Sequence, residues 1–375
     1  MGDEGPETLN ILMRIMRRPW GRDWAIACAL ALSVFTTAAT AQQRLAAPPR
    51  ATHPMDALTI SEVARAVALI KAAGFADARA RFPTITLQEL PKAQVLTWRP
   101  GQAFARRAFV VMRDQGRTFE ITVDLTAGTV TRPELRPGAN PNMILDEWLI
   151  ARDLTVKDPR WLAAMKQRGI TDLKKVSCSP LSPGYFTNEP YGDRRVLKVP
   201  CYELETGTSH LYGRPITGVF AVIDVEEKRV LDVIDLGVVA LPPQPDPRRV
   251  TRAALKPVQM TSALGRNYKI SGALQVEWDN WSFHMRMERR VGPVISLVRY
   301  NDRGNRRLIA YQMSLSEMFV PYMDPGADWS YRTYMDSGEF GAGFLMSSLM
   351  AGSDCPADAA YITMAVPNDT GRSFP

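Results

Sequence analysis

Histidine is scarce in this sequence of 375 residues, which contains only His53, His210 and His284. The three lie too far apart along the chain to form a compact site from neighbouring ligands, and no His-x-His pair occurs. The signatures of a histidine-rich metal centre are therefore missing. From the sequence alone we expect no metal site in this chain.

Cysteine is also sparse, with four residues, of which Cys28 belongs to the N-terminal segment. Cys178 and Cys201 flank a loop rich in proline and glycine, and we expect them to form a disulfide in an oxidising compartment. Cys355 is then left over. No histidine lies near it in the sequence, which argues against a cysteine nucleophile.

Long apolar runs are lacking except near the N-terminus. There, several arginines precede the run Trp24–Phe35, which leads to an A-x-A pattern at Ala39–Ala41. This order predicts a cleaved signal peptide over residues 1–41 and a periplasmic or secreted protein. A single membrane anchor is the less favoured alternative, because the run is short and Asp23 borders it. We expect no membrane contact beyond the signal.

The net charge of +7 raises the question of a polyanionic partner. However, the arginines are scattered along the chain, and no stretch alternates basic with aromatic residues. We therefore expect no nucleic-acid partner.

The length and the 46% hydrophobic content allow two or three domains. We expect a first small α+β module over residues 55–140. Thr59-Ile-Ser-Glu62 is a candidate capping box for a helix that ends at Gly74. Four runs that resemble strands follow, namely Thr84–Leu90, Ala93–Trp98, Arg107–Arg113 and Thr118–Leu125.

A second module over residues 145–240 repeats the first. Its expected elements are a helix over Pro159–Arg168, a strand over Val196–Leu204, and a hairpin of Val219–Val225 with Arg229–Ile234. The repeat is visible in matching segments. Val123-Asp124-Leu125 precedes Val130 as Ile223-Asp224-Val225 precedes Val230, and the helix end Lys71-x-x-Gly74 matches Lys166-x-x-Gly169.

A proline-rich linker over residues 241–270 separates the modules from a region of strands over 271–375. The strand runs are Leu274–Trp278, Phe283–Arg289, Val294–Tyr300 and Arg307–Gln312, with a turn at Asp302–Gly304. The predicted fold class is α+β: two small duplicated α+β modules followed by the first strands of an incomplete antiparallel β-sandwich.

The stretch Val320–Gly343 holds the densest chemistry, with Tyr322, Tyr334 and Asp336 followed by several glycines. Glycine allows a close approach of backbone or ligand to the acid. The apolar and aromatic surroundings of Asp336 are expected to raise its pKa and to make it a better base near neutrality. By itself, Asp-Ser-Gly is also a common turn sequence.

At this point the chain resembles a known family. Four segments resemble the opening of the catalytic domain of copper-containing, topaquinone-dependent primary amine oxidases: Ser316-Glu317-Met318, Val320-Pro321-Tyr322, Tyr334–Phe340 and Gly352-Ser353-Asp354-Cys355. The resemblance implies that Asp336 is the proton acceptor and that Tyr322 lies beside it in the substrate channel. It further implies substrate contacts from Tyr334, Gly338 and Phe340.

The family implies more. Its complete members are homodimers that convert primary amines to aldehyde, ammonia and hydrogen peroxide with copper and topaquinone, and they carry two small related α+β domains ahead of a large β-sandwich. The quinone arises from the tyrosine of a T-x-x-N-Y-[DE] motif, and three histidines hold the copper, two of them as His-x-His. Here Asn267-Tyr268 is followed by Lys269, and His-x-His is missing.

The family's partner for Cys355 lies beyond the position of Pro375. These departures lead us to expect a chain that is truncated within the catalytic domain, holds no copper or topaquinone cofactor and is inactive by itself. The alternative is a secreted, non-catalytic interaction protein built on the two modules. Asp336 with Glu339 as a glycosidase pair is disfavoured, because their spacing on a loop is not assured. Glu317 and Glu339 are expected to pair with neighbouring arginines, and His284 to be a partly exposed sheet residue.

Overall fold

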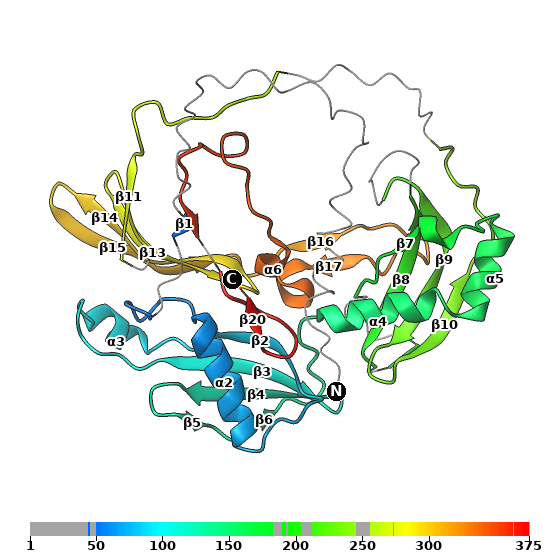
Figure 1. Cartoon of the computed structure of the whole chain (residues 1–375), viewed down its shortest axis with the longest axis horizontal. Helices are drawn as coiled ribbons and strands as arrows, with labels where there is room; N and C mark the ends of the chain where they lie inside the picture. The colour runs from blue at the N-terminus through cyan, green and yellow to red at the C-terminus, as the bar shows by residue number, and fades with distance from the viewer. Residues whose placement is uncertain are drawn as a thin grey trace, which may run out of the picture. The chain divides into compact units, whose positions relative to one another are not determined.

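The first module places one helix against an antiparallel sheet. Helix α2 (Ile60–Ala72) lies against a sheet of order β2-β3-β4-β5, in which β6 also pairs with β4 (Figure 1). The buried side chains of α2 belong to the same core cluster as those of the sheet. The strands are β2 (Arg81–Leu87), β3 (Arg107–Asp114), β4 (Arg117–Asp124), β5 (Thr129–Val130) and β6 (Glu134–Leu135). The alternation of buried and partly exposed residues along β3 gives the sheet its apolar face.

The structure is a computed structural model that describes residues 44–45, 50–182, 190–192, 194–204, 212–244, 256–272, 274–362 and 364–374. The expected signal peptide, His210 and part of the expected linker lie outside these ranges. Within them, no helix is both long enough and apolar enough to span a bilayer.

The predicted capping box is confirmed at the start of α2. The Thr59 hydroxyl accepts the Glu62 N–H, and the Glu62 carboxylate accepts the Thr59 N–H. Gly74 follows the helix with φ of +75°, the left-handed conformation that only glycine adopts at low cost.

One predicted strand of this module is wrong. Residues Ala93–Trp98 lie mostly in a short helix, α3 (Lys92–Thr97), which starts after Pro91. Only Val95 of this helix is buried. A run of six residues with one buried side chain does not distinguish a strand from a helix by periodicity, and the proline favours a helix start.

The second module has two helices, α4 (Leu145–Thr155) and α5 (Pro159–Gln167), on a sheet of order β10-β9-β8-β7. A short 3₁₀ turn (Leu173–Lys175) leads into that sheet. Its strands are β7 (Val176–Cys178), β8 (Val196–Glu203), β9 (Pro215–Asp224) and β10 (Arg229–Asp235). The predicted hairpin is confirmed. Helix α4 was missed because its charged residues, Asp146, Glu147, Arg152 and Asp153, interrupt the apolar pattern.

The duplication appears in matching hairpin turns. In the first module Val123 pairs with Val130 and Asp124 with Thr129. In the second, Ile223 pairs with Val230 and Asp224 with Arg229. The side chain of each aspartate accepts the N–H groups two and three residues later, so the same sequence pattern forms the same turn twice.

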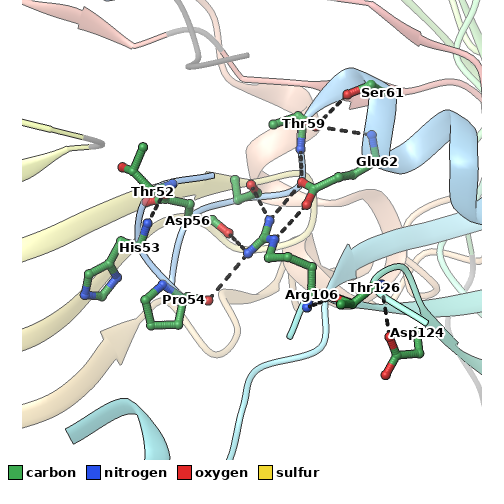
Figure 2. A network of polar contacts seen from close by, with 11 residues as sticks. Thr52, His53, Pro54, Asp56, Thr59, Ser61, Glu62, Arg106, Asp124 and Thr126 are labelled. Atoms are coloured by element: carbon green, nitrogen blue, oxygen red, sulfur yellow. Dashed lines mark hydrogen bonds and ion pairs between the residues drawn. The ribbon is translucent and has the colours of Figure 1, made fainter. Parts of the chain in front are cut away.

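A buried arginine–glutamate pair recurs in both modules. Arg106 donates to both carboxylate oxygens of Glu62 at 2.7 and 2.9 Å and to the carbonyls of Asp56 and Ala57 (Figure 2). Arg195 similarly donates to both oxygens of Glu147, at 2.6 and 2.9 Å, and to the carbonyls of residues 141 and 142. Because Glu62 and Glu147 lie in the first turns of α2 and α4, the start of α4, rather than the start of α5, corresponds to the start of α2.

The third sheet is a meander of consecutive antiparallel strands. These are β11 (Tyr268–Ser271), β12 (Gln275–Trp278), β13 (Trp281–Glu288), β14 (Gly292–Asp302) and β15 (Asn305–Ser314). The four predicted strand runs and the turn at Asp302–Gly304 are confirmed. The α+β prediction is confirmed with them.

The rest of the chain forms short elements. They are β16 (Phe319–Pro321), β17 (Thr333–Met335), a π-type turn (Asp336–Phe340), α6 (Ala342–Leu345), β18 (Tyr361–Ile362), β19 (Val366–Pro367) and β20 (Ser373–Phe374). Strand β18 pairs with the two-residue strand β1 (Arg44–Leu45). The hairpin β19–β20 reaches the first module, where a Cβ on Gly371 would lie 2.4 Å from Val67.

The buried pair of the second module leads to a prediction. Replacing Arg195 with methionine leaves Glu147 buried without its partner, and we expect a loss of about 3–5 kcal/mol in the free energy of unfolding. The double variant Arg195→Met, Glu147→Met is expected to lose less, because no charge is stranded. Urea unfolding measures both, with Arg152→Met, on the exposed face of α4, as the control expected to change stability by about 0.5 kcal/mol or less. Equal stability of the single variant and the control would contradict the prediction.

Candidate functional site

Asp336 begins the π-type turn that follows β17. Strands β16 and β17 pair through Phe319 with Met335 and Val320 with Tyr334. The Asp336 N–H continues this ladder by donating to the Met318 carbonyl at 3.0 Å, and the Asp336 carbonyl accepts the Gly341 N–H at 2.8 Å. The backbone of Asp336 is thus fixed at both of its polar groups.

Glu317, two residues before β16, holds the turn by hydrogen bonds. Its two carboxylate oxygens accept the N–H groups of Ser337 at 2.7 Å and Gly338 at 2.9 Å. A Cβ on Gly338 would lie 2.9 Å from Glu317 Oε2, so a larger residue here would require this carboxylate to shift. The expected pairing with arginine is wrong: among the described residues Glu317 forms no ion pair and binds backbone N–H groups instead.

The electrostatic surroundings of Asp336 favour its protonated form. Desolvation by burial is the larger cause and the negative charge of Glu317 the smaller, and together they raise the pKa of Asp336. The pKa of Asp336 is thus shifted upward, as the sequence led us to expect. A carboxylate with a raised pKa is a stronger base than an ordinary aspartate once it is ionised.

Glu339 is a second perturbed carboxylate on the same turn. Burial raises the pKa of Glu339 to about 7, and the charges of Glu317 and Asp336 act in the same direction. Hydrogen bonds from Met335 and Ser182 offset only part of this. Within the described ranges no arginine forms an ion pair with it, so the expected role as an arginine partner is wrong here too.

The predicted aromatic residues form a contiguous row. Tyr322 is 52% exposed and packs edge-on against Tyr334, with ring centroids 5.4 Å apart. Tyr334 in turn packs on Phe340 at 5.9 Å, and Phe340 contacts Trp148 of α4 at 5.8 Å. Burial raises the pKa of Tyr334 far above its usual range, so its hydroxyl stays protonated. The row runs from solvent at Tyr322 to the second module.

Two groups of the segment just before α4 position the turn. The Asn142 side-chain amide donates to the Ser337 carbonyl and the Met143 N–H to the Glu339 carbonyl, both at 2.8 Å. A small cavity beside the turn is lined by Phe340, Gly341, Asn142, Arg289 and residues of β2, and Asp336 does not line it. These contacts were invisible in the sequence, because they join positions almost 200 residues apart.

The structure also brings two histidines together. Asp56 and His284 are 6% and 1% exposed, and His284 Nε2 lies 2.8 Å from Asp56 Oδ1. The His53 ring stacks on the His284 ring with centroids 4.5 Å apart. Burial, followed by the effect of His284, lowers the pKa of His53 to about 4. The expectation that His284 is partly exposed is therefore wrong. His53 and His284 also lie side by side in the structure, although they are far apart along the chain.

The expected disulfide is present. Cys178 and Cys201 are bonded, and they face each other in the β7–β8 ladder. Cys355 is a free thiol whose Sγ lies 3.4 Å from the Tyr361 hydroxyl.

Three family models match consecutive parts of the chain. They are the copper amine oxidase N2 domain over residues 53–135, the N3 domain over 146–251 and the enzyme domain over 270–374. The chain belongs to the copper amine oxidase family. The recognition based on the motifs around Asp336 is thereby confirmed.

Curated proteins that are similar to this chain are amine oxidases by name. The chain is 35% identical over 329 residues to a primary amine oxidase of Klebsiella aerogenes, covering 85% of this chain and 43% of that protein. It is 32% identical over 331 residues to a histamine oxidase of Arthrobacter globiformis, covering 86% and 48%. The chain therefore spans about half the length of these copper amine oxidase relatives.

A solved structure shows the same fold. The copper-containing benzylamine oxidase of Hansenula polymorpha matches with a TM-score of 0.72 at 23% identity, covering 86% of this chain and 53% of that one. The arrangement of modules and sheets is therefore that of a copper amine oxidase.

The raised pKa of Glu339 predicts how stability depends on pH. The folded state binds the proton of Glu339 more tightly than the unfolded state does, in which the pKa of Glu339 is 4.5. The stabilisation from this proton is complete below pH 4.5 and is lost as pH rises through about 7. Glu339→Gln keeps the hydrogen-bond acceptor without the charge. We expect the variant to gain about 1–2 kcal/mol relative to the native chain between pH 5 and pH 8.

Urea unfolding at both pH values measures the difference. Glu277→Gln, at a carboxylate that is 56% exposed, is the control and is expected to show no such gain. A pH-independent effect of Glu339→Gln would contradict the assignment.

Proposed function

We propose that this chain supplies the substrate side of the active site of a copper- and quinone-dependent primary amine oxidase. In this proposal Asp336 accepts the proton lost from the α-carbon of the amine. The observation that carries it is the fixed position of Asp336, with a raised pKa, beside a row of aromatic side chains.

The neighbouring residues take roles consistent with their places. Tyr322, exposed at the solvent end of the row, borders the entrance for substrate. Tyr334 and Phe340 provide an apolar wall that excludes water from the amine's side chain. Gly338 leaves room for the Glu317 carboxylate, which holds the turn so that Asp336 keeps its orientation.

The copper and quinone of the family do not fit the residues of this chain. The only group of three candidate ligands among the described residues is His53, Asp56 and His284, which offers two imidazoles and a carboxylate rather than three imidazoles. The sequence contains neither N-Y-[DE] nor His-x-His. The chemistry assigned to these residues therefore stops at binding the amine and moving its proton.

In this proposal the complete enzyme converts primary amines to aldehyde, ammonia and hydrogen peroxide, and this chain contributes the binding of the amine and the transfer of its proton. The relatives' names support primary amines as the substrate class, since they include a primary amine oxidase, a histamine oxidase and a benzylamine oxidase. A homodimer and a periplasmic or secreted location also belong to the proposal. The A-x-A pattern and the disulfide Cys178–Cys201 support export.

The second candidate is a secreted, non-catalytic interaction protein built on the two modules. The mismatch between the ligand set and the family's cofactors favours it. Unlike the first candidate function, it gives Asp336 no chemical role.

A direct assay tests whether the 375 residues act alone. We expect the purified chain, loaded with copper, to release no hydrogen peroxide above background from benzylamine or phenylethylamine and to show no quinone absorbance, since no residue matches the quinone motif. The coupled peroxidase assay uses the Klebsiella aerogenes enzyme as positive control. Turnover by this chain would contradict the mismatch.

A chimera tests the role of Asp336. Residues 50–374 of this chain replace the matching part of the Klebsiella aerogenes enzyme. In the active chimera, Asp336→Asn is expected to lower kcat/KM by a factor of about 10² to 10⁴, the usual contribution of a general base. Asp336→Glu is expected to restore part of the rate, and Asp302→Asn, at the β14–β15 turn, to leave it unchanged. An Asp336→Asn chimera as fast as its parent would support the interaction protein instead.

A further inference from the structure

His53, Asp56 and His284, the histidine cluster, have no role in the proposed function. One ligand atom from each lies within 4.8 Å of the others. Imidazole nitrogens with a carboxylate oxygen are donors that divalent first-row metal ions accept. We propose that the histidine cluster binds one Zn²⁺ ion, which ties the segment before α2 to strand β13.

The carboxylate of this cluster is already oriented. Asp56 Oδ2 accepts the N–H groups of Thr52 and His53, each at 2.8 Å, which turns Oδ1 toward His284. The Oδ1–Nε2 separation of 2.8 Å suits a hydrogen bond. It is about 0.5 Å shorter than the spacing of about 3.3 Å between two donors of a four-coordinate zinc. Asp56 and His284 therefore need to move apart by only about 0.5 Å.

His284 has a means of adopting the required tautomer. In the metal-free ring the proton on Nε2 makes the bond to Asp56; on coordination that proton leaves Nε2 and the ring carries one on Nδ1 instead. His284 Nδ1 is buried without a hydrogen-bond partner, and so is the hydroxyl of Ser296, directly opposite in the β13–β14 ladder. The hydroxyl is a candidate acceptor for the Nδ1 proton, as the second nitrogen of a ligating histidine usually requires.

His53 is the ligand that must move. Donors around a four-coordinate zinc lie about 3.3 Å apart, so the 4.8 Å spread requires a shift of about 1.5 Å. His53 also gives up the N–H of Met55, which its Nδ1 accepts at 3.1 Å. Its position permits this, since it is only partly buried in the segment before the helix (Figure 2). Trp98 packs edge-on against it at 4.9 Å and shields the site on that side.

The choice of zinc follows from the donors and their geometry. Calcium and magnesium prefer oxygen ligands, which the two imidazoles do not supply. Zinc has no preferred geometry from its d electrons and tolerates a set that is not fully arranged beforehand. The guanidinium of Arg106 is neutralised by Glu62. The positive charge of Arg299 also acts on His53 and opposes a cation, so the Asp56 carboxylate is the group that balances the ion.

Zinc titration of the 375-residue chain after removal of metal by EDTA tests the proposal. Calorimetry is expected to give one equivalent bound at micromolar or lower Kd, and zinc is expected to raise the Tm. His53→Gln keeps the buried His284–Asp56 pair, so it is expected to fold, to weaken binding by at least about 10-fold and to abolish the rise in Tm. His210→Gln, at the third histidine of the sequence, is the matched control and is expected to bind as the native chain does. X-ray absorption of the zinc-loaded chain is expected to show two imidazole ligands.

Three outcomes would overturn the zinc proposal. The native chain binds no stoichiometric zinc, His53→Gln binds zinc as tightly as the native chain does, or the bound ion has fewer than two imidazole ligands. None of these results bears on Asp336, so the zinc site and the amine oxidase proposal stand or fall separately.

Discussion

The buried pair of Arg195 and Glu147 links the core of the second module to the candidate active site. The guanidinium, 1% exposed, fixes the start of α4 through Glu147 and also binds the carbonyls of residues 141 and 142. The next groups along that segment, the Asn142 amide and the Met143 N–H, hold the turn that carries Asp336. Removing either charge strands the other in a buried place, so the geometry of the turn depends on this pair.

The turn itself concentrates negative charge. Glu317, Asp336 and Glu339 act on one another, and within the described residues no arginine pairs with them. Backbone N–H groups at Glu317 provide the compensation that arginines provide elsewhere in this chain. Burial and like charge together move the pKa values of Asp336 and Glu339 upward, which is the condition that a base working near neutrality requires.

The duplicated module shows how one local pattern is reused. The same aspartate-containing turn and the same arginine–glutamate pair occur twice. In the first module the pair's surroundings include Asp56 and lead to the histidine cluster; in the second they lead to the Asp336 turn. The same arginine–glutamate pair thus supports the histidine cluster in the first module and the Asp336 turn in the second.

Sequence reasoning succeeded where the physical cause is local. The capping box at Thr59, the hairpin turn after Asp224 and the strands of the meander follow from residues close together in the chain. It failed at α3, where a short run fits two periodicities, and at α4, where charges interrupt the apolar face. The charge of Glu147 makes sense only with Arg195, 48 residues away.

The sequence by itself determined the family, through short motifs in order, and the candidate base Asp336 with its aromatic neighbours. The tertiary structure alone decided which groups surround that base. Glu317 binds the backbone of its turn, Glu339 is a second carboxylate with a raised pKa, and Asn142 supports the turn from the segment before α4. The tertiary structure also joined His284 to Asp56, separated by 228 residues. Burial and pKa depend on what packs around a side chain, and these neighbours come from distant segments whose proximity no local pattern encodes.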